Sequence, residues 1–248
     1  MRLDQATWQE VEARIAETPG IILPAGSTEQ HGPMGLIGTD SICAEKIAGD
    51  AAELAGCLVA PTLAYAPAPF NMAFAGTVSV SAELFASLFA EIVASLRTHG
   101  FALVYVLNGH GANLDPLKAA AANIEGIQIH IRSWWDFEPV NALRQQLYGD
   151  WEGMHATPSE IAITQATHRV VAPGDAAQPP EKLSPDFIAA HAGDRHGPPD
   201  EHRRQFPDGR VGSHSALARP EHGKAILDAA AKAVADDFSA ALQISGSG

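Results

Sequence analysis

The sequence contains little cysteine and little positive charge. Two cysteines, Cys43 and Cys57, occur among 248 residues, so we expect reduced thiols rather than a disulfide framework, which favours a reducing compartment. Lys and Arg number 16 against 29 Asp and Glu, which gives a net charge of −13. This charge repels phosphate backbones and anionic membranes, so nucleic acid and membrane are not expected partners. Solubility is the simplest interpretation of the acidity.

Long apolar runs are also missing. No run reaches the roughly 18–20 residues that a membrane span requires. Residues 1–18 carry acidic side chains from Asp4 onward and have no apolar centre, unlike a signal peptide. We therefore expect a cytoplasmic protein. With 46% hydrophobic residues, the chain is long enough for one large core, and we expect one domain over 1–248.

The chain alternates between helical and strand-like patterns. One helix pattern places Trp8, Val11 and Ile15 on a common face. Helical patterns cover 4–17, 39–56, 80–98, 114–126, 139–149, 157–168 and 219–242. Apolar strand-like runs cover 20–26, 57–67, the first part of 101–113, and 127–137. Because most of these runs are continuously apolar, we predict an α/β fold: a three-layer α/β/α single domain with a mostly parallel sheet.

A long stretch from 172 to 218 is rich in Pro, Gly, Asp and His. We expect it to be mostly loop around a short helix near 184–191. Long irregular segments in compact domains are usually functional or disordered. A substrate lid, an oligomer contact and a solvated loop are the three interpretations.

Glycine-containing polar turns follow two of the predicted strands. "AGSTEQHG" brings Glu29 and His31, and "NGHGAN" brings His110 between two glycines that let the backbone bend sharply. Glu29 and His31 are two residues apart, so both point to one side of an extended segment. In parallel sheets, ligands bind beyond the carboxyl ends of the strands. We therefore expect both turns to meet at one edge, with Asp40 at the start of the helix over 39–56.

One Glu, two His and one Asp form a nitrogen and oxygen set suited to Zn²⁺, Mn²⁺ or Fe²⁺. A further carboxylate would supply enough ligands for two metal ions about 3.5 Å apart. Solvated polar turns are the alternative, and the spacing alone does not decide between the two.

A third polar cluster is "WEGMHATPSEIAIT". Thr157 is a candidate helix cap and Pro158 a candidate first helical residue. Glu160 then lies in the first turn, where the helix dipole favours a carboxylate. In the functional interpretation, Glu160 binds metal and His155 transfers protons. The alternative is a capped surface helix with an incidental histidine.

Together, "ILPAGSTEQHGP…GTD", "NGHGAN" and the "HA…SE" helix start resemble the creatininase family of metal-dependent amidohydrolases, from about residue 18 to 168. The resemblance implies an α/β domain in a homo-oligomer, often a hexamer. It also implies a dinuclear site, commonly zinc with manganese, zinc or iron. The activity implied is hydrolysis of linear or cyclic C–N amide bonds other than peptide bonds.

Residue by residue, the resemblance implies that Asp40 bridges two metal ions. The implied ligands are Glu29, His31, Asp40, His110 and Glu160. His155 would be the acid/base group that protonates the leaving nitrogen, with Glu160 beside it, after a metal-activated hydroxide attacks the amide carbonyl. The implied substrate-binding residues are Trp134, Trp135, Thr77 and Gly111.

The sequence also departs from the family pattern. Ala112 stands where creatininase itself carries a carboxylate ligand, which places more weight on Glu160. Met34, Gly35 and Pro158 differ from the usual residues, so creatinine is not the expected substrate. Two alternatives stay open: a catalytically lapsed metal-binding or oligomeric scaffold, and a lactone or phosphoester hydrolase. The scarcity of Lys and Arg near the motifs disfavours a phosphoester substrate, because phosphate is anionic.

Overall fold

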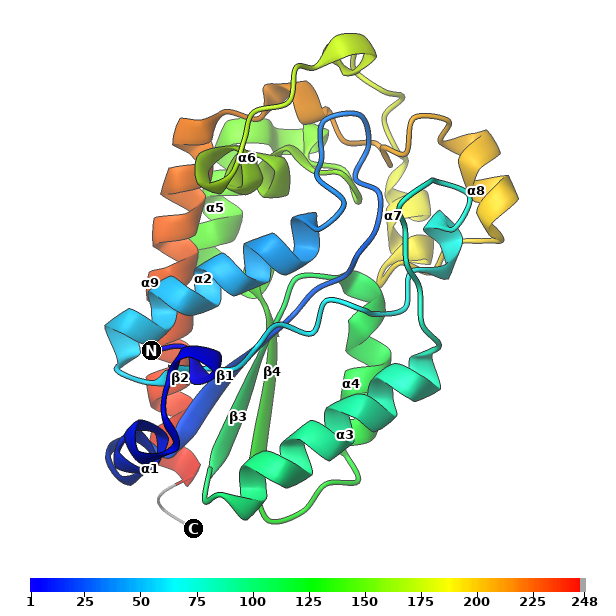
Figure 1. Ribbon diagram of the computed structural model, residues 1–248. Coiled ribbons are helices and arrows are strands. Elements are labelled where there is room, and N and C mark those ends of the chain that lie inside the picture. The colour runs from blue at the N-terminus through cyan, green and yellow to red at the C-terminus, as the bar shows by residue number, and fades with distance from the viewer. Residues whose placement is uncertain (246–248) are drawn as a thin grey trace.

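The computed structural model describes residues 1–245 and contains a four-stranded parallel sheet (Figure 1). The strand order is β2 (Leu58–Val59), β1 (Gly20–Ala25), β3 (Leu103–Asn108), β4 (Gln128–Ser133). Ala25 is in register with Asn108, and Asn108 with Ser133. Three strands therefore end at the same level, which aligns the turns that follow them. The predicted parallel sheet is confirmed.

Helices cover both faces of the sheet. Leu103, Tyr105 and Leu107 of β3 pack toward α2 (Thr39–Ala55) and α9 (Pro220–Ser245). The intervening Val104 and Val106 belong to a second apolar cluster on the opposite face. That cluster packs against α3 (Ala82–Thr98) and α4 (Leu114–Ala121). Because side chains alternate along a strand, one apolar strand serves two cores, and the predicted three-layer α/β/α arrangement is confirmed.

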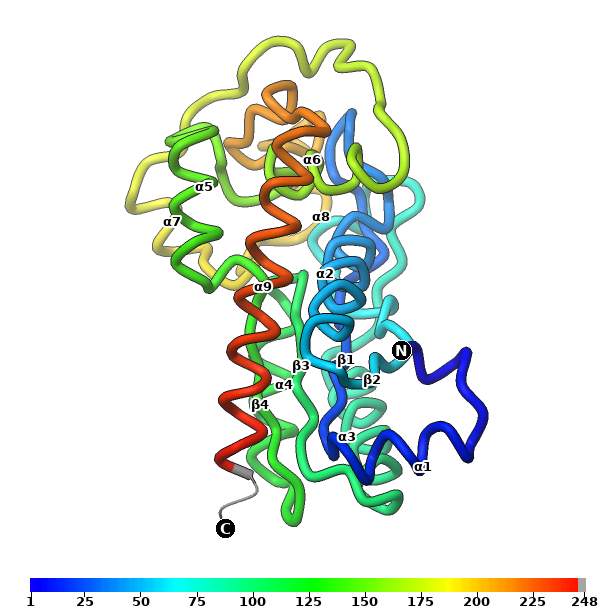
Figure 2. The backbone as a smooth tube through the Cα atoms, turned by 90° about the vertical axis from the view of Figure 1, so that its left-hand side faces the viewer, coloured from blue at the N-terminus to red at the C-terminus, as the bar shows by residue number. Residues whose placement is uncertain are grey.

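The remaining helices pack around this framework. Figure 2 shows α9 running the length of the molecule beside the sheet. The helices α5 and α6 both contact α9. The other helices are α1 (Trp8–Glu17), α5 (Glu138–Tyr148), α6 (Pro158–Thr167), α7 (Pro185–His191) and α8 (Pro199–Gln205). Within residues 1–245, no helix has both the length and the apolar character needed to cross a membrane.

Several predicted boundaries change. The first helix begins at Trp8 rather than residue 4, because Thr7 and Glu10 form a capping box there. Trp8, Val11 and Ile15 share one face of α1 as predicted, but Trp8 is 67% exposed, whereas Val11 and Ile15 are partly buried. The strand expected over 57–67 is reduced to β2, because Pro61 and Pro67 lack the N–H groups that a ladder requires.

The segment 172–218 is more ordered than expected. Its predicted short helix corresponds to α7, but α8 was missed in the sequence. The pattern of α8, "PDEHRRQ", has no apolar residue to reveal a buried face.

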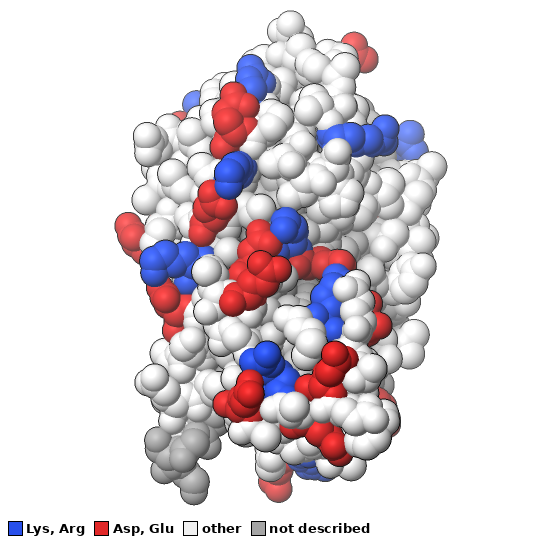
Figure 3. Space-filling view, turned by 60° about the vertical axis from the view of Figure 1, so that its left-hand side comes forward, with Lys and Arg blue, Asp and Glu red and all other residues white. Residues whose placement is uncertain are grey.

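The surface charge and the state of the two cysteines are as the composition predicts. On the face in Figure 3, Lys and Arg are interspersed with a larger number of acidic side chains. Cys43 and Cys57 are both buried and unbonded, as expected for reduced thiols.

A glycine on α9 allows its close approach to α6. A Cβ added at Gly223 would lie 1.9 Å from the carbonyl oxygen of Ala162, so Gly223→Ala forces the helices apart. We expect this variant to lose roughly 1–3 kcal/mol of unfolding free energy in urea titration. Gly49→Ala in α2 is the matched control, because its added Cβ meets nothing within 4 Å. We expect the control to gain up to about 1 kcal/mol. Equal effects of the two substitutions would contradict this packing.

Candidate metal centre

The candidate centre lies where β1, β3 and the start of α2 meet. Glu29 and His31 follow β1, His110 follows β3, and Asp40 occupies the first turn of α2. Glycines make this approach possible: a Cβ at Gly109 would lie 2.5 Å from the Asp40 carbonyl oxygen. The two turns therefore meet at one sheet edge, as the strand-end rule predicts.

Asp40 lies at the middle of the cluster. Its Oδ1 is 2.8 Å from Nε2 of His31, and its Oδ2 is 3.1 Å from Nδ1 of His110. The same His110 nitrogen is 3.2 Å from Oε1 of Glu29, and His31 Nε2 is 4.0 Å from Oε1 of Glu160. The residues assembled here are 0–7% exposed: Glu29, His31, Asp40, His110, His155 and Glu160.

Each histidine of the cluster is oriented by a backbone carbonyl. Nε2 of His110 is 2.7 Å from the Pro67 oxygen, and Nδ1 of His31 is 3.1 Å from the Glu29 oxygen. Nε2 of His155 is 2.7 Å from the Gln30 oxygen. A carbonyl only accepts, so each of these ring nitrogens carries the hydrogen. The other nitrogen of each ring faces the carboxylates, an arrangement typical of metal-ligating histidines.

The donor set fits divalent metal ions. Carboxylate oxygens 3.1–3.2 Å from an imidazole nitrogen require either a proton or a cation between them. Oε1 of Glu29 is buried and has no hydrogen-bond partner. Two groups of three residues share Asp40, and within each group the donor atoms all lie within 4.8 Å of one another. The groups are Glu29, Asp40 and His110, and His31, Asp40 and Glu160. A further group joins Glu29, His31 and His155.

Comparison with known proteins agrees with this geometry. The family model described as creatinine amidohydrolase, Creatininase, matches residues 4–238. The chain belongs to the creatininase family. It is 27% identical over 253 residues to the creatinine amidohydrolase of Pseudomonas putida, covering 94% of each chain. The structure titled "Creatininase Mn" superposes with a TM-score of 0.78 at 26% identity, covering 95% of this chain and 96% of the other.

A shorter match links the chain to a peptidase. It is 36% identical over 115 residues to the mycofactocin precursor peptide peptidase of Mycobacterium ulcerans, covering 43% of this chain and 46% of the relative. Members of the creatininase family thus include proteins named for peptide and non-peptide substrates. Membership of this family makes the chain a hydrolase, without specifying its substrate.

Two carboxylates of the cluster stay ionised despite burial. Burial opposes ionisation of Asp40, but His31 and His110 hold the pKa of Asp40 well below its usual range. Burial likewise opposes ionisation of Glu29, and His110 and His155 bring its pKa below the usual value. Burial would lower the pKa of His31, but Asp40 beside it raises that pKa to about 10. The cluster is therefore strongly attractive to cations.

Burial sets the direction of the pKa shifts of His155 and Glu160, unlike those of the other residues of the cluster. Burial, reinforced by His31, lowers the pKa of His155 to about 4, so this imidazole is neutral at pH 7. Burial raises the pKa of Glu160 to about 7. Glu160 is also held by the capping box of α6, because its Oε1 accepts the N–H of Thr157 at 2.5 Å.

Hydrogen bonds from neighbouring elements hold the carboxylates in place. The Ser27 hydroxyl donates to Oδ2 of Asp40 at 2.7 Å, and the Asn71 amide donates to Oε2 of Glu29 at 3.0 Å. Neither donor was singled out in the sequence, although Ser27 lies within the first polar turn.

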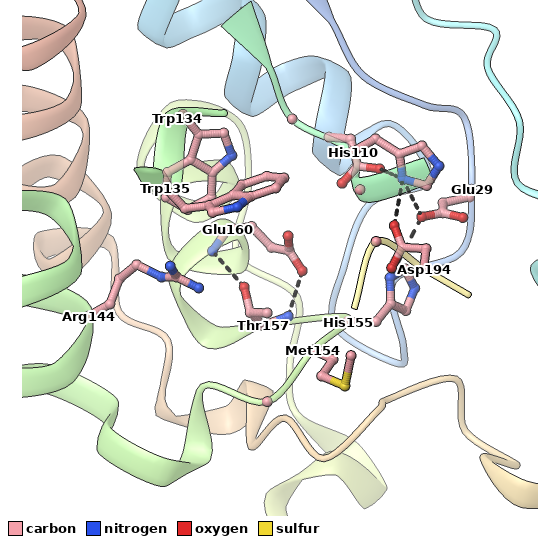
Figure 4. A pocket seen from close by; sticks show the side chains of 15 residues that line it. Glu29, His110, Trp134, Trp135, Arg144, Met154, His155, Thr157, Glu160 and Asp194 are labelled. Carbon is pink, nitrogen blue, oxygen red and sulfur yellow. Dashed lines mark hydrogen bonds and ion pairs between the residues drawn. The ribbon is translucent and has the colours of Figure 1, made fainter. Parts of the chain in front are cut away.

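A cavity of about 180 Å³ opens beside the cluster (Figure 4). Trp134, Trp135 and Gly111 line it, together with Arg144 and Met154. Trp134 is 1% exposed and also packs in the core, whereas Trp135 is half-buried. The two indoles meet edge to face, with ring centroids 5.5 Å apart.

Other sequence candidates lie elsewhere. Thr77 is outside the lining of this cavity, and its hydroxyl accepts the backbone N–H of Gln30 at 3.1 Å. Met34, which departs from the usual family residue, is outside the lining of the cavity; it is 4% exposed and packs against α6 residues such as Ile161. Asp194, from the irregular segment between α7 and α8, lines the cavity and was missed.

Proton release provides a test of the ligand set. The pKa of His31 is about 10, and the carboxylates raise the pKa of His110 well above its usual value. His31 is therefore protonated at pH 8 without metal and must lose a proton to become a ligand, and the raised pKa of His110 acts in the same direction. We expect Zn²⁺ binding at pH 8 to release at least one proton per chain, and binding to strengthen as pH rises.

Calorimetry in two buffers of different ionisation enthalpy measures this release. His31→Ala should reduce it by one proton, whereas His99→Ala, an exposed histidine after α3, should leave it unchanged. Zinc binding without proton release would contradict the assignment of these ligands.

Proposed function

We propose that this protein is a metal-dependent hydrolase that cleaves the C–N amide bond of a small linear or cyclic molecule. The observation that carries the proposal is the buried donor set in which Asp40 faces His31 with one oxygen and His110 with the other. Membership of the creatininase family supports the reaction class.

The residues proposed to hold two divalent ions are Glu29, His31, Asp40, His110 and Glu160, with Asp40 shared. Imidazole and carboxylate ligands suit Zn²⁺, and also Mn²⁺ or Fe²⁺. A manganese form among the similar creatininase structures supports this choice. Bound in this way, two ions supply Lewis acidity toward a carbonyl and activate water at neutral pH.

His155 is the proposed acid/base group. Its Nε2 hydrogen is donated to the Gln30 carbonyl, which leaves Nδ1 as the lone-pair nitrogen, 3.6 Å from Oε1 of Glu29. A neutral imidazole can accept a proton at Nδ1 and return it to the leaving nitrogen of the amide. Glu160 is the second proposed catalytic group: its pKa is about 7 without metal, and as a ligand its carboxylate would be ionised.

The cavity favours a small substrate. Its volume of about 180 Å³ is below the roughly 300–1,000 Å³ of sites for drug-sized ligands. Trp135 and the backbone of Gly111 would contact the substrate. A peptide requires more room than this cavity provides, so we propose amides other than peptide bonds.

A phosphoester is a poorer fit. Arg144 is the one Lys or Arg among the described residues lining the cavity, and its Nε donates to Oε1 of Glu152 at 2.9 Å. Its charge is therefore already balanced. Creatinine belongs among the compounds to test, because Met34 packs in the core and does not obstruct the cavity.

Elemental analysis combined with a substrate panel tests the proposal. We expect close to two divalent ions per wild-type chain and a marked loss in His110→Ala, with His99→Ala as the matched control. The panel should contain small amides, lactams, creatinine, a lactone, a phosphoester and dipeptides. Amide or lactam turnover that disappears with the metal supports the proposal. Two bound ions without turnover of any compound would favour the scaffold alternative.

Replacing His155 tests its role separately. His155→Ala should lower turnover of the best amide by roughly 10²–10⁴-fold, because proton transfer to the leaving nitrogen is lost. The metal content should stay at the wild-type value. Unchanged turnover would remove His155 from the mechanism, and loss of an ion would make it a ligand instead.

A further inference from the structure

The carboxylate of Asp194 reaches the metal centre from the irregular segment between α7 and α8. Its side chain is 13% exposed, and its Oδ2 accepts the N–H of Ala112 at 3.0 Å. The same oxygen lies 3.7 Å from Nδ1 of His110 (Figure 4).

The local backbone is adapted to this position. Asp194 has φ +58, a left-handed conformation that residues with a Cβ seldom adopt. A Cβ added at Gly111 would lie 2.4 Å from Oδ2 of Asp194, so the carboxylate can approach His110 because residue 111 is glycine. Strained conformations of this kind persist where the surrounding structure holds them.

Three carboxylate oxygens surround Nδ1 of His110. They belong to Glu29 at 3.2 Å, Asp40 at 3.1 Å and Asp194 at 3.7 Å. Four ligands placed about 2.0–2.2 Å from one zinc ion in a tetrahedron are separated by roughly 3.4 Å. The three distances from Nδ1 of His110 lie near that value, and the donor atoms of Glu29, Asp40 and His110 all lie within 4.8 Å of one another.

The carboxylates of this group have no permanent cation beside them. Oε1 of Glu29 is fully buried, has no hydrogen-bond partner, and lies 3.2 Å from Nδ1 of His110. Among the described residues lining the cavity, Arg144 is the one permanent cation, and it is paired with Glu152. Three carboxylates around one imidazole nitrogen therefore call for a proton or a metal cation at their centre.

We propose that Asp194 is a fourth ligand, completing a set of three carboxylates and one imidazole for the ion held by Glu29, Asp40 and His110. The segment from α7 to α8 is thereby fastened over the cavity when the ion is bound. This inference rests on the dinuclear site of the proposed function.

Zinc titration monitored by calorimetry tests the ligand assignment. We expect Asp194→Asn to bind one of its two Zn²⁺ ions at least about tenfold more weakly, with the other unaffected. Asp200→Asn, the same change at an exposed position of α8, is the matched control and should bind as wild type. Two ions bound to Asp194→Asn with wild-type affinity would overturn the inference and leave the proposed function standing. Absence of zinc binding by the wild type would overturn both.

Gly111→Ala provides a second test that replaces none of the proposed ligand residues. Its added methyl group would displace the Asp194 carboxylate, so the same ion should again be weakened. Unchanged zinc affinity in Gly111→Ala would contradict the placement of Asp194.

Proteolysis tests whether the segment is fastened. Arg195 follows Asp194 and is exposed, which makes it a site for trypsin. Zn²⁺ should slow cleavage after Arg195 in the wild type and in Asp200→Asn, and should give no protection in Asp194→Asn. Equal protection of all three proteins would contradict the fastening.

Discussion

The buried carboxylate of Asp40 is the group on which the rest of the centre depends. A buried charge is costly unless it is paired and hydrogen-bonded. Here each oxygen faces a different histidine, the Ser27 hydroxyl donates to one of them, and the first turn of α2 adds a favourable dipole. Because both histidines are fixed by backbone carbonyls, the carboxylate has little freedom to relax. The arrangement becomes balanced when cations or protons occupy the space between these groups.

The fold supplies this environment through a tight junction at the ends of β1 and β3. The Asn113 amide donates to the Gly26 carbonyl at 3.0 Å and to Oδ1 of Asn108 at 3.1 Å, which ties the two strand ends together. Gly26 and Gly109 allow α2 to pack directly on that junction. The helix start that carries Asp40 is thus positioned by backbone contacts, so the metal centre is built on rigid elements.

The sequence predicted those parts of the fold and site that local pattern controls. Continuous apolar runs with aligned polar turns indicated the parallel sheet and brought Glu29, His31 and His110 to one edge. The "TPSE" pattern correctly placed Thr157 at the cap and Glu160 in the first turn of α6. Asp194 could not be predicted, because its position depends on the path of an irregular segment and on the missing Cβ of Gly111.

Other differences have similar causes. Trp8, the first residue of α1, is 67% exposed, whereas Val11 and Ile15 on the same helix face are partly buried. Helical spacing identifies a face but not how much of it the fold covers. The helix α8 has no apolar stripe, and its burial depends on His202, which packs 5.1 Å from the ring centroid of Phe70. Such contacts are tertiary and leave no periodic signal in the chain.

Anomalous diffraction at the zinc edge, from crystals grown with Zn²⁺, is the most direct test of a shared Asp40. The account predicts two peaks about 3.5–4 Å apart, one on each side of the Asp40 carboxylate. One peak should lie beside His110 and the other beside His31. A single peak, or peaks that do not share Asp40, would contradict the dinuclear centre.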